Sequence, residues 1–286
     1  MRTPVLFNAM AGSGKLAVAL ERLAPRHALD LVPSNDPGRM RAQAAELAAA
    51  HSRVLVAGGD GTVHHAIRGL AGSSTILGIL AAGTGNDFAC ALDLPLELEP
   101  AIELALAAPA TRVDLGRAGR VPFAGIAGIG IVADVLTYLS EFTRRYRGNW
   151  VYPWAVLRTV LTYRALNVEV ESECGRFSGP AMMVAAANAP RFGGGMLAAP
   201  EASMQDGLLD VVILARTSRT RLVRLLPRVY RGTHLADPSC RFFRAAEVRF
   251  GSDPGAVVYA DGEALPETTA GGVTLRIDAG GLRVAR

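Results

Sequence analysis

Along the first part of the chain, short apolar runs alternate with longer stretches in which apolar residues recur at helical spacing. Short apolar runs bounded by turn residues predict buried strands, and the helical spacing predicts helices that cover them. This alternation is typical of a parallel α/β sheet with helices on both faces. The predicted strands are 4–8, 29–32, 53–57 and 76–80, and the predicted helices are 15–22, 38–50 and 63–70.

After about residue 115 the pattern changes to strand-like segments interrupted by only two helical stretches, near 132–163 and 218–232. We therefore expect a nucleotide-binding α/β domain over 1–117 and a β-rich sandwich domain over 118–274. A closing strand near 275–286 could complete the first domain, which the sequence alone leaves open. The predicted strands of the second domain are 166–173, 181–188, 207–214, 246–250, 255–260 and 273–277.

Composition narrows the class of protein. Half of the residues are apolar, which supplies a core and argues against disorder. The net charge of +4 is too weak a bias for a dedicated nucleic-acid binder. Cys90, Cys174 and Cys240 have no metal-ligand spacing, and no uncharged apolar run is long enough to span a bilayer. We expect a cytoplasmic protein without disulfides, zinc or a nucleic-acid partner.

Two glycine-rich motifs directly follow predicted strands, at 58–62 (Gly-Gly-Asp-Gly-Thr) and 83–87 (Gly-Thr-Gly-Asn-Asp). In parallel sheets ligands bind at this end of the strands. Glycines let backbone N–H groups approach a phosphate, and the N-terminus of the next helix favours negative charge. We therefore expect the two loops to clasp one nucleotide, with the Asp60 carboxylate near its magnesium. The alternative is a tight strand-to-helix turn in which Thr62 is the N-cap.

The loop after the first strand, 8–15 (Asn-Ala-Met-Ala-Gly-Ser-Gly-Lys), resembles a Walker A motif only superficially. That motif requires Gly where Ala9 stands and Ser or Thr where Leu16 stands, so a Walker A loop is excluded. A general phosphate-facing loop remains the prediction.

A late tripeptide, Asp261-Gly262-Glu263, follows the predicted strand 255–260. A carboxylate at a strand end can project into a cleft and accept the proton of an alcohol that attacks a γ-phosphate. Orientation matters more than base strength in such a loose transition state. By itself the tripeptide is more often a hairpin turn.

Taken together, these motifs resemble those of the bacterial diacylglycerol kinase and lipid kinase family, which is related to sphingosine kinases and more remotely to NAD kinases and phosphofructokinases. The resemblance covers nearly the whole chain and implies a phosphofructokinase/NAD-kinase-like α/β domain followed by a β-rich sandwich. It rests on 8–12, 58–62, 83–88, Asp114, 193–195, 206–210 and 261–263.

The resemblance also implies roles for single residues. Asp261 resembles the family's proton acceptor, and Glu263 would support it. Ser203, Asp206 and Leu208 resemble a structural metal site, for which the alternative is an ordinary turn. Asp60, Asp87 and Asp114 resemble the carboxylates of a water-linked magnesium network near the active site. The residues expected to contact ATP are Asn8, Ala9, Met10, Ala11, Gly12, Ser34, Gly58, Gly59, Asp60, Gly61, Thr62, Val63, His64, His65, Gly83, Thr84 and Asn86.

Several positions depart from the family pattern. Ala9 and Ala11 replace the usual Pro and Ser of the first loop, and Cys90 replaces an Arg. His64 and His65 replace the usual Asn-Glu pair, and we predict both to be helix-surface residues near the ATP site. These departures leave the residue that resembles the base and the carboxylates in place, and they bear on the affinity for ATP.

Two segments could contact a membrane surface. The stretch 216–231 carries six arginines and no acid, with arginines on one helical face and leucines on another. A helix packed on the core with a solvated polar face is an equal alternative. The second segment, 144–163, combines arginines with Trp150, Tyr152 and Trp154, which suit a headgroup boundary, an acyl-chain cleft or the core.

We therefore expect a magnesium-dependent enzyme that transfers the γ-phosphate of ATP to diacylglycerol or a similar lipid. The alternatives are a kinase of a sphingoid base or another alcohol, and a catalytically weak lipid-binding regulatory protein. Peripheral contact with an anionic membrane fits this function, and the sequence leaves the oligomeric state open, a homodimer included.

Overall fold

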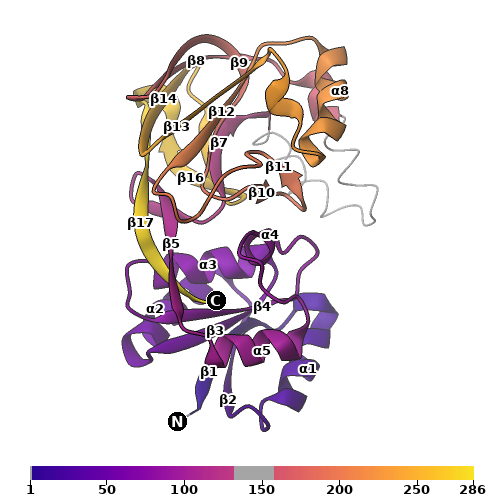
Figure 1. Ribbon diagram of the computed structural model, residues 1–286, viewed down its shortest axis with the longest axis vertical. Helices are drawn as coiled ribbons and strands as arrows, with labels where there is room; N and C mark the ends of the chain where they lie inside the picture. Colours follow the sequence, from indigo (N-terminus) through magenta and orange to yellow (C-terminus); the bar gives the residue numbers. More distant parts are fainter. Residues whose placement is uncertain (1, 132–157) are drawn as a thin grey trace.

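The computed structural model describes residues 2–131 and 158–286, which form two lobes stacked along the long axis of the molecule (Figure 1). The lower lobe is α/β and the upper lobe is largely antiparallel β structure, so the predicted fold class is confirmed. The aromatic cluster predicted at Trp150, Tyr152 and Trp154 lies outside the described residues.

The N-terminal lobe is built on four parallel strands in the order β2-β1-β3-β4. Each strand is a short apolar run, as predicted, because helices cover both faces of the sheet. Its strands are β1 (Thr3–Asn8), β2 (Leu29–Ser34), β3 (Arg53–Gly58) and β4 (Ile76–Ala81). Its helices are η1 (Ala11–Gly14), α1 (Lys15–Leu23), α2 (Pro37–Ala50), α3 (Asp60–Leu70), α4 (Asp87–Ala91) and α5 (Leu98–Ala107).

The C-terminal lobe consists mainly of antiparallel strands around a second apolar core. Its strands are β6 (Val121–Phe123), β7 (Ile126–Gly130), β8 (Leu166–Glu171), β9 (Arg176–Ala187), β10 (Arg191–Phe192), β11 (Met196–Leu197), β12 (Leu209–Ala215), β13 (Cys240–Ala245), β14 (Glu247–Asp253), β15 (Val257–Ala260) and β16 (Glu263–Thr268). The helices that lie wholly within its described residues include α8 (Arg219–Tyr230), η2 (His234–Ala236) and η3 (Thr269–Gly271).

Two long strands, β5 (Ala110–Ala118) and β17 (Val273–Ala285), join the lobes and pair with each other in antiparallel register (Figure 1). The beginning of β17 pairs with β14 in the upper lobe, and its end pairs in parallel with β4 in the lower lobe. One continuous sheet therefore passes through both lobes, and this strand pair fixes how they face each other.

Candidate functional site

The two predicted phosphate loops touch each other at the carboxyl ends of β3 and β4. A Cβ atom on Gly83 would lie 2.6 Å from the Cα atom of Gly59, so the backbones pack too closely for any side chain there. A Cβ atom on Gly85 would lie 2.9 Å from the Asp60 carboxylate and 3.2 Å from the Cα atom of Gly194. The glycines of both motifs thus allow three chain segments to converge on Asp60.

Helix α3 begins at Asp60, three residues earlier than predicted, and its N-cap residue is Gly59. No side chain caps this end, so Thr62 is not the N-cap and that alternative reading is wrong. Uncapped N–H groups together with the helix dipole form an anion-binding site. The turn can therefore receive a phosphate group.

A polar cavity of about 660 Å³ opens beside this helix end. Its volume suits a small-molecule ligand such as a nucleotide. The Ser34 hydroxyl on its wall is buried and has no hydrogen-bond partner, so a ligand could satisfy it. The cavity is lined by Asn8, Ala11, Ser34, Asn35, Asp36, Pro37, Met40, Gly59, Gly61, Thr62, His65, Ala82, Gly83 and Thr84.

Several other residues that were expected to contact ATP lie away from the polar cavity. Val63 is buried in the lobe's core, and Met10 is 70% exposed. Asn86 holds the second loop, because its side chain accepts a hydrogen bond from the Gly83 N–H and donates one to the Gly83 carbonyl. Ala9 and Gly58 do not line the polar cavity, and Asp60 and His64 line a different one.

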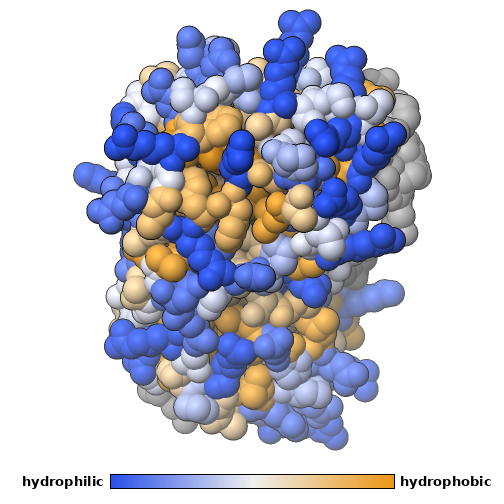
Figure 2. Space-filling model, turned by 45° about the horizontal axis from the view of Figure 1, so that its top comes forward, coloured by the Kyte–Doolittle hydropathy of each residue, from blue (hydrophilic) through white to orange (hydrophobic). Residues whose placement is uncertain are grey.

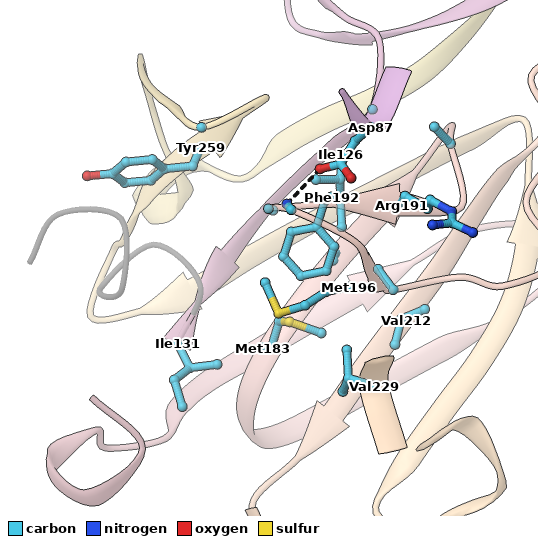
Figure 3. A pocket seen from close by; sticks show the side chains of 18 of the residues that line it. Asp87, Ile126, Ile131, Met183, Arg191, Phe192, Met196, Val212, Val229 and Tyr259 are labelled. Atoms are coloured by element: carbon cyan, nitrogen blue, oxygen red, sulfur yellow. Dashed lines mark hydrogen bonds between the residues drawn. The ribbon is translucent and has the colours of Figure 1, made fainter. Parts of the chain in front are cut away.

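Asp87 connects the two lobes at the loop 193–195. Its carboxylate accepts hydrogen bonds from the N–H groups of Gly194 (2.8 Å) and Gly195 (2.9 Å), and a dashed line in Figure 3 marks a hydrogen bond of Asp87. Burial raises the pKa of the Asp87 carboxyl, and the charge of nearby Asp60 adds to the effect. Two neighbouring carboxylates of this kind suit a cation between them.

Asp114 forms a separate cluster with the turn before β12. Its carboxylate accepts hydrogen bonds from the N–H groups of Gly207 (2.8 Å) and Gly280 (2.7 Å), so it ties that turn to β17. The Asp206 carboxylate accepts a hydrogen bond from the Leu208 N–H, and the Ser203 hydroxyl accepts one from the Gln205 N–H. Within the described ranges no three His, Cys, Asp or Glu side chains are grouped to hold a metal.

A second, larger cavity of about 740 Å³ lies between the lobes and is mostly apolar. Phe192, Met183, Met196, Val212 and Val229 surround it in Figure 3. Space-filling atoms in Figure 2 show hydrophobic residues exposed among projecting hydrophilic ones on one face of the molecule. The cavity shares Gly61 and Thr84 with the polar cavity, so the two meet at the phosphate loops.

Helix α8 forms part of this apolar wall. Leu222 and Leu225 are buried against the core and line the cavity, which confirms the core-packed reading for that face. Across residues 2–131 and 158–286, no helix is long and apolar enough to cross a membrane.

Asp261 lines the apolar cavity and lies in the turn between β15 and β16. Its carboxylate accepts hydrogen bonds from three consecutive backbone N–H groups, those of Ala124 (2.7 Å), Gly125 (2.8 Å) and Ile126 (3.2 Å). A Cβ atom on Gly125 would lie 3.1 Å from the carboxylate, so glycine permits this close approach. The charge of Asp261 is therefore held in one orientation at the cavity wall.

Glu263 does not contact Asp261 through any described hydrogen bond but pairs with helix α3 of the other lobe. Its carboxylate lies 2.8 Å from His65 Nε2 and also pairs with Arg68, which donates to the Ala260 carbonyl as well. The prediction that His64 and His65 are helix-surface residues is wrong, because their side chains are only 14% and 16% exposed. The β15–β16 turn covers them.

Sequence reasoning assigned no role to Arg68 or to the loop 193–195, although the motif of that loop was noted. Both act between lobes, and nothing in the local sequence identifies a partner 195 residues away, as for Arg68 and Glu263, or 107 residues away, as for Gly194 and Asp87. The unusual His-His pair was the one visible signal that this face of α3 differs from the family pattern.

Comparison with known proteins agrees with this architecture. Residues 2–118 match the family model of the diacylglycerol kinase catalytic domain, and residues 125–286 match the YegS C-terminal NAD kinase beta sandwich-like domain. A "probable lipid kinase YegS-like" protein of Pseudomonas putida is 36% identical over 183 residues, which is 63% of this chain and 61% of that protein. A diacylglycerol kinase of Mycobacterium tuberculosis is 29% identical over 274 residues, covering 92% of this chain and 88% of the relative.

The fold is also found among solved structures. A diacylglycerol kinase from Bacillus anthracis superposes with a TM-score of 0.76 at 21% identity, covering 99% of this chain and 96% of that one.

Proposed function

Because the chain belongs to the lipid kinase family built from these two domains, we propose that it transfers the γ-phosphate of ATP to the hydroxyl group of diacylglycerol or a closely similar lipid. The observation that carries this proposal is the meeting of a polar and an apolar cavity at Gly61 and Thr84. A nucleotide in the first and a lipid in the second would bring phosphate and hydroxyl together there.

The polar cavity supports the placement of ATP. Its phosphates would lie at the uncapped start of α3, where N–H groups and the helix dipole stabilise negative charge. The buried Ser34 hydroxyl would find a partner on the nucleoside. Ala11 lines the same cavity without a hydroxyl, so the phosphate contact that a serine supplies at this position in the family would be lost.

Magnesium fits the pair of carboxylates at the junction. Asp60 and Asp87 lie close enough for one charge to affect the other, and a divalent cation among them would offset that repulsion. When bound, magnesium would neutralise the charge that develops on the transferring phosphoryl group. We leave Asp114 out of this magnesium site, because its carboxylate accepts the N–H groups of Gly207 and Gly280 instead. Ser203, Asp206 and Leu208, in the turn that Asp114 holds, are the proposed ligands of a second, structural cation.

The apolar cavity supports a lipid acceptor. Among the described residues, its wall is largely aliphatic side chains, methionines and Phe192, and the Asp and Arg side chains that line it are Asp60, Asp87, Arg191 and Asp261. Acyl chains would lie against this wall, with the hydroxyl toward Asp261. The arginine face of α8 would then rest on an anionic membrane surface.

Phosphate transfer from labelled ATP to a panel of acceptors tests the proposal. Diacylglycerol should become labelled and give a phosphatidic-acid-type product, while ceramide, sphingosine and NAD should be poor acceptors. Asp60→Asn should abolish transfer, and Thr84→Ala should chiefly raise the KM for ATP, because Thr84 lies where both cavities meet. Labelling of sphingosine alone would establish the alternative acceptor. Vesicle binding with no transfer to any acceptor would establish a lipid-binding regulator instead.

A further inference from the structure

His65 connects the polar cavity to the hairpin that carries Asp261. The ring projects from α3 and lines the polar cavity, and its Nε2 lies 2.8 Å from Glu263 Oε1 on β16, in the other lobe. An ionised carboxylate offers only lone pairs, and two lone pairs repel each other at this distance, so Nε2 carries the hydrogen. The tautomer of the neutral ring is therefore fixed, and its lone pair is on Nδ1.

The other ring nitrogen of His65 is open to a ligand. No described residue forms a hydrogen bond with Nδ1, and Nδ1 is not one of the buried atoms that lack a partner, so it is accessible. The cavity that the ring lines also contains Gly61 and Thr62, from the start of α3, where an anion is stabilised. A nucleotide in this cavity would therefore bring its charge to the wall that includes the ring.

Four ionisable groups act on the His65 ring from three elements. Glu263 on β16 and Asp36, the N-cap of α2, favour the protonated ring, whereas Arg68 and His64 on α3 oppose it. Burial has the largest effect and lowers the pKa of the imidazole, so without a ligand the ring is mainly neutral at neutral pH. One more negative charge nearby would shift this balance toward the imidazolium.

We propose that His65 takes up a proton when ATP binds and so couples the nucleotide to the hairpin that carries Asp261, an inference that rests on the proposed kinase function. The triphosphate brings negative charge to the cavity, which favours the imidazolium. The proton comes from solvent and goes to Nδ1, while Nε2–H stays directed at Glu263. A contact of a neutral ring thus becomes an ion pair that holds the β15–β16 turn against α3 while the nucleotide is bound. His65 is a positioning residue in this scheme and accepts no proton from the lipid.

Proton uptake on nucleotide binding tests the proposal. Magnesium ATP, without a lipid acceptor, is titrated into the protein at about pH 7 in two buffers that differ in ionisation enthalpy, so that the difference in heat counts the protons bound. Wild type should take up part of a proton, and its Kd for ATP should rise with pH, by about tenfold per pH unit for a whole proton. His65→Gln keeps an amide N–H for Glu263 but cannot titrate. Its uptake should be smaller and its Kd less dependent on pH, and protons bound by ATP itself cancel between the two proteins.

Two further variants serve as control and as safeguard. His51→Gln changes a histidine at the C-cap of α2 that does not line either cavity in the described part of the chain, and it should take up as many protons as wild type. Glu263→Gln keeps the test decisive if His65→Gln folds poorly. It removes the charge that stabilises the imidazolium, so proton uptake should fall in this variant too.

The pH dependence of transfer tests the positioning role. In single-turnover transfer of the γ-phosphate to diacylglycerol at saturating ATP, the wild-type rate should show a decrease as His65 loses its proton, and His65→Gln should lack this step. Equal proton uptake in wild type and His65→Gln would overturn the proposal, as would identical pH profiles of the transfer rate. Absence of ATP binding or of transfer in wild type would instead contradict the kinase function itself.

Discussion

At the scale of single residues, burial opposes the charging of His234. Its ring is 4% exposed and pairs through Nε2 with the Ala198 carbonyl, and burial lowers the pKa of the imidazole. Between that lowered value and the ordinary value of about 6.5, the unfolded chain binds more protons than the folded one. The contribution of His234 to the free energy of unfolding is therefore fully present above about pH 6.5 and is lost as the pH falls below that value.

We accordingly expect His234→Gln to reduce the loss of stability on acidification from about pH 7.5 to about pH 5.5, the interval around the ordinary histidine pKa. The comparison with wild type is needed because burial raises the pKa of Asp87 and Asp210, which opposes the effect at lower pH. Urea unfolding at both pH values measures the difference. An unchanged pH dependence in the variant would show that His234 charges at no cost in the folded protein.

The sequence motifs identified single carboxylates but not the distant residues that lie against them. Asp60 and Asp87 were found from sequence because a carboxylate after a glycine-rich strand end has a recognisable local pattern. The contact of Asp87 with Gly194 and the position of His64 against Asp261 join segments more than a hundred residues apart. No local pattern encodes such distances, so those partners had to come from the structure.

At the scale of elements, helix α8 combines a buried apolar face with exposed arginines that differ in their pairing. Arg221 and Arg228 lie 3.5 Å and 3.3 Å from the Asp237 carboxylate, so part of the predicted membrane-facing charge is already neutralised. Arg224 and Arg231 are exposed, and neither forms an ion pair with another residue in the described part of the chain. They lie on the helix face opposite Leu222 and Leu225 and are therefore the better candidates for contact with anionic headgroups.

We expect Arg224→Gln/Arg231→Gln to weaken binding to anionic vesicles by about 2 kcal/mol, since each basic residue near such a surface contributes about 1 kcal/mol. The matched control Arg221→Gln/Arg228→Gln removes the same charge from the paired positions and should weaken binding less. Sedimentation with phosphatidylserine-containing vesicles at two salt concentrations measures both. Equal losses in the two variants would indicate a diffuse charge effect and not a docking face.

The predicted strands, and the predicted helices 15–22, 38–50, 63–70 and 218–232, have counterparts in the structure because apolar runs and helical spacing are local properties, but α5, β5 and β7 were not predicted. Strand β13 was missed since its sequence, Cys-Arg-Phe-Phe-Arg-Ala, mixes arginines with apolar residues at the edge of the sheet. Strand β17 proved much longer than the predicted 273–277. Gly280 and Gly281 interrupt its apolar pattern where it passes between lobes, so its sequence does not look like one strand.

At the scale of the whole molecule, the site exists only where the two lobes meet. Beyond the β5–β17 pair, Arg68 of α3 binds the β15–β16 hairpin, through the Glu263 carboxylate and the Ala260 carbonyl. Its side chain is 9% exposed, so this contact is largely shielded from water. The residue next to that carbonyl is Asp261, so Arg68 holds the turn that carries Asp261 against the lobe that contains the two glycine-rich loops.

Replacing Arg68 should accordingly slow phosphate transfer without weakening the binding of ATP. Arg68→Met keeps the apolar stem but removes both contacts, so the turn carrying Asp261 should lose its fixed distance to the γ-phosphate, and misplacement by 1 Å or so can cost about 100-fold in rate. We expect kcat to fall while the Kd for ATP stays near wild type, because Arg68 does not line the polar cavity.

Arg117→Met is the matched control: it breaks an ion pair with Asp278 on the β5–β17 pair, away from both cavities, and should leave kcat unchanged. Steady-state kinetics, ATP titration and thermal unfolding of both variants distinguish the outcomes. Equal kcat in the two variants at comparable stability would show that the β5–β17 pair alone sets the distance between the lobes, whereas a loss confined to Arg68→Met would show that α3 and the hairpin must be held together for transfer.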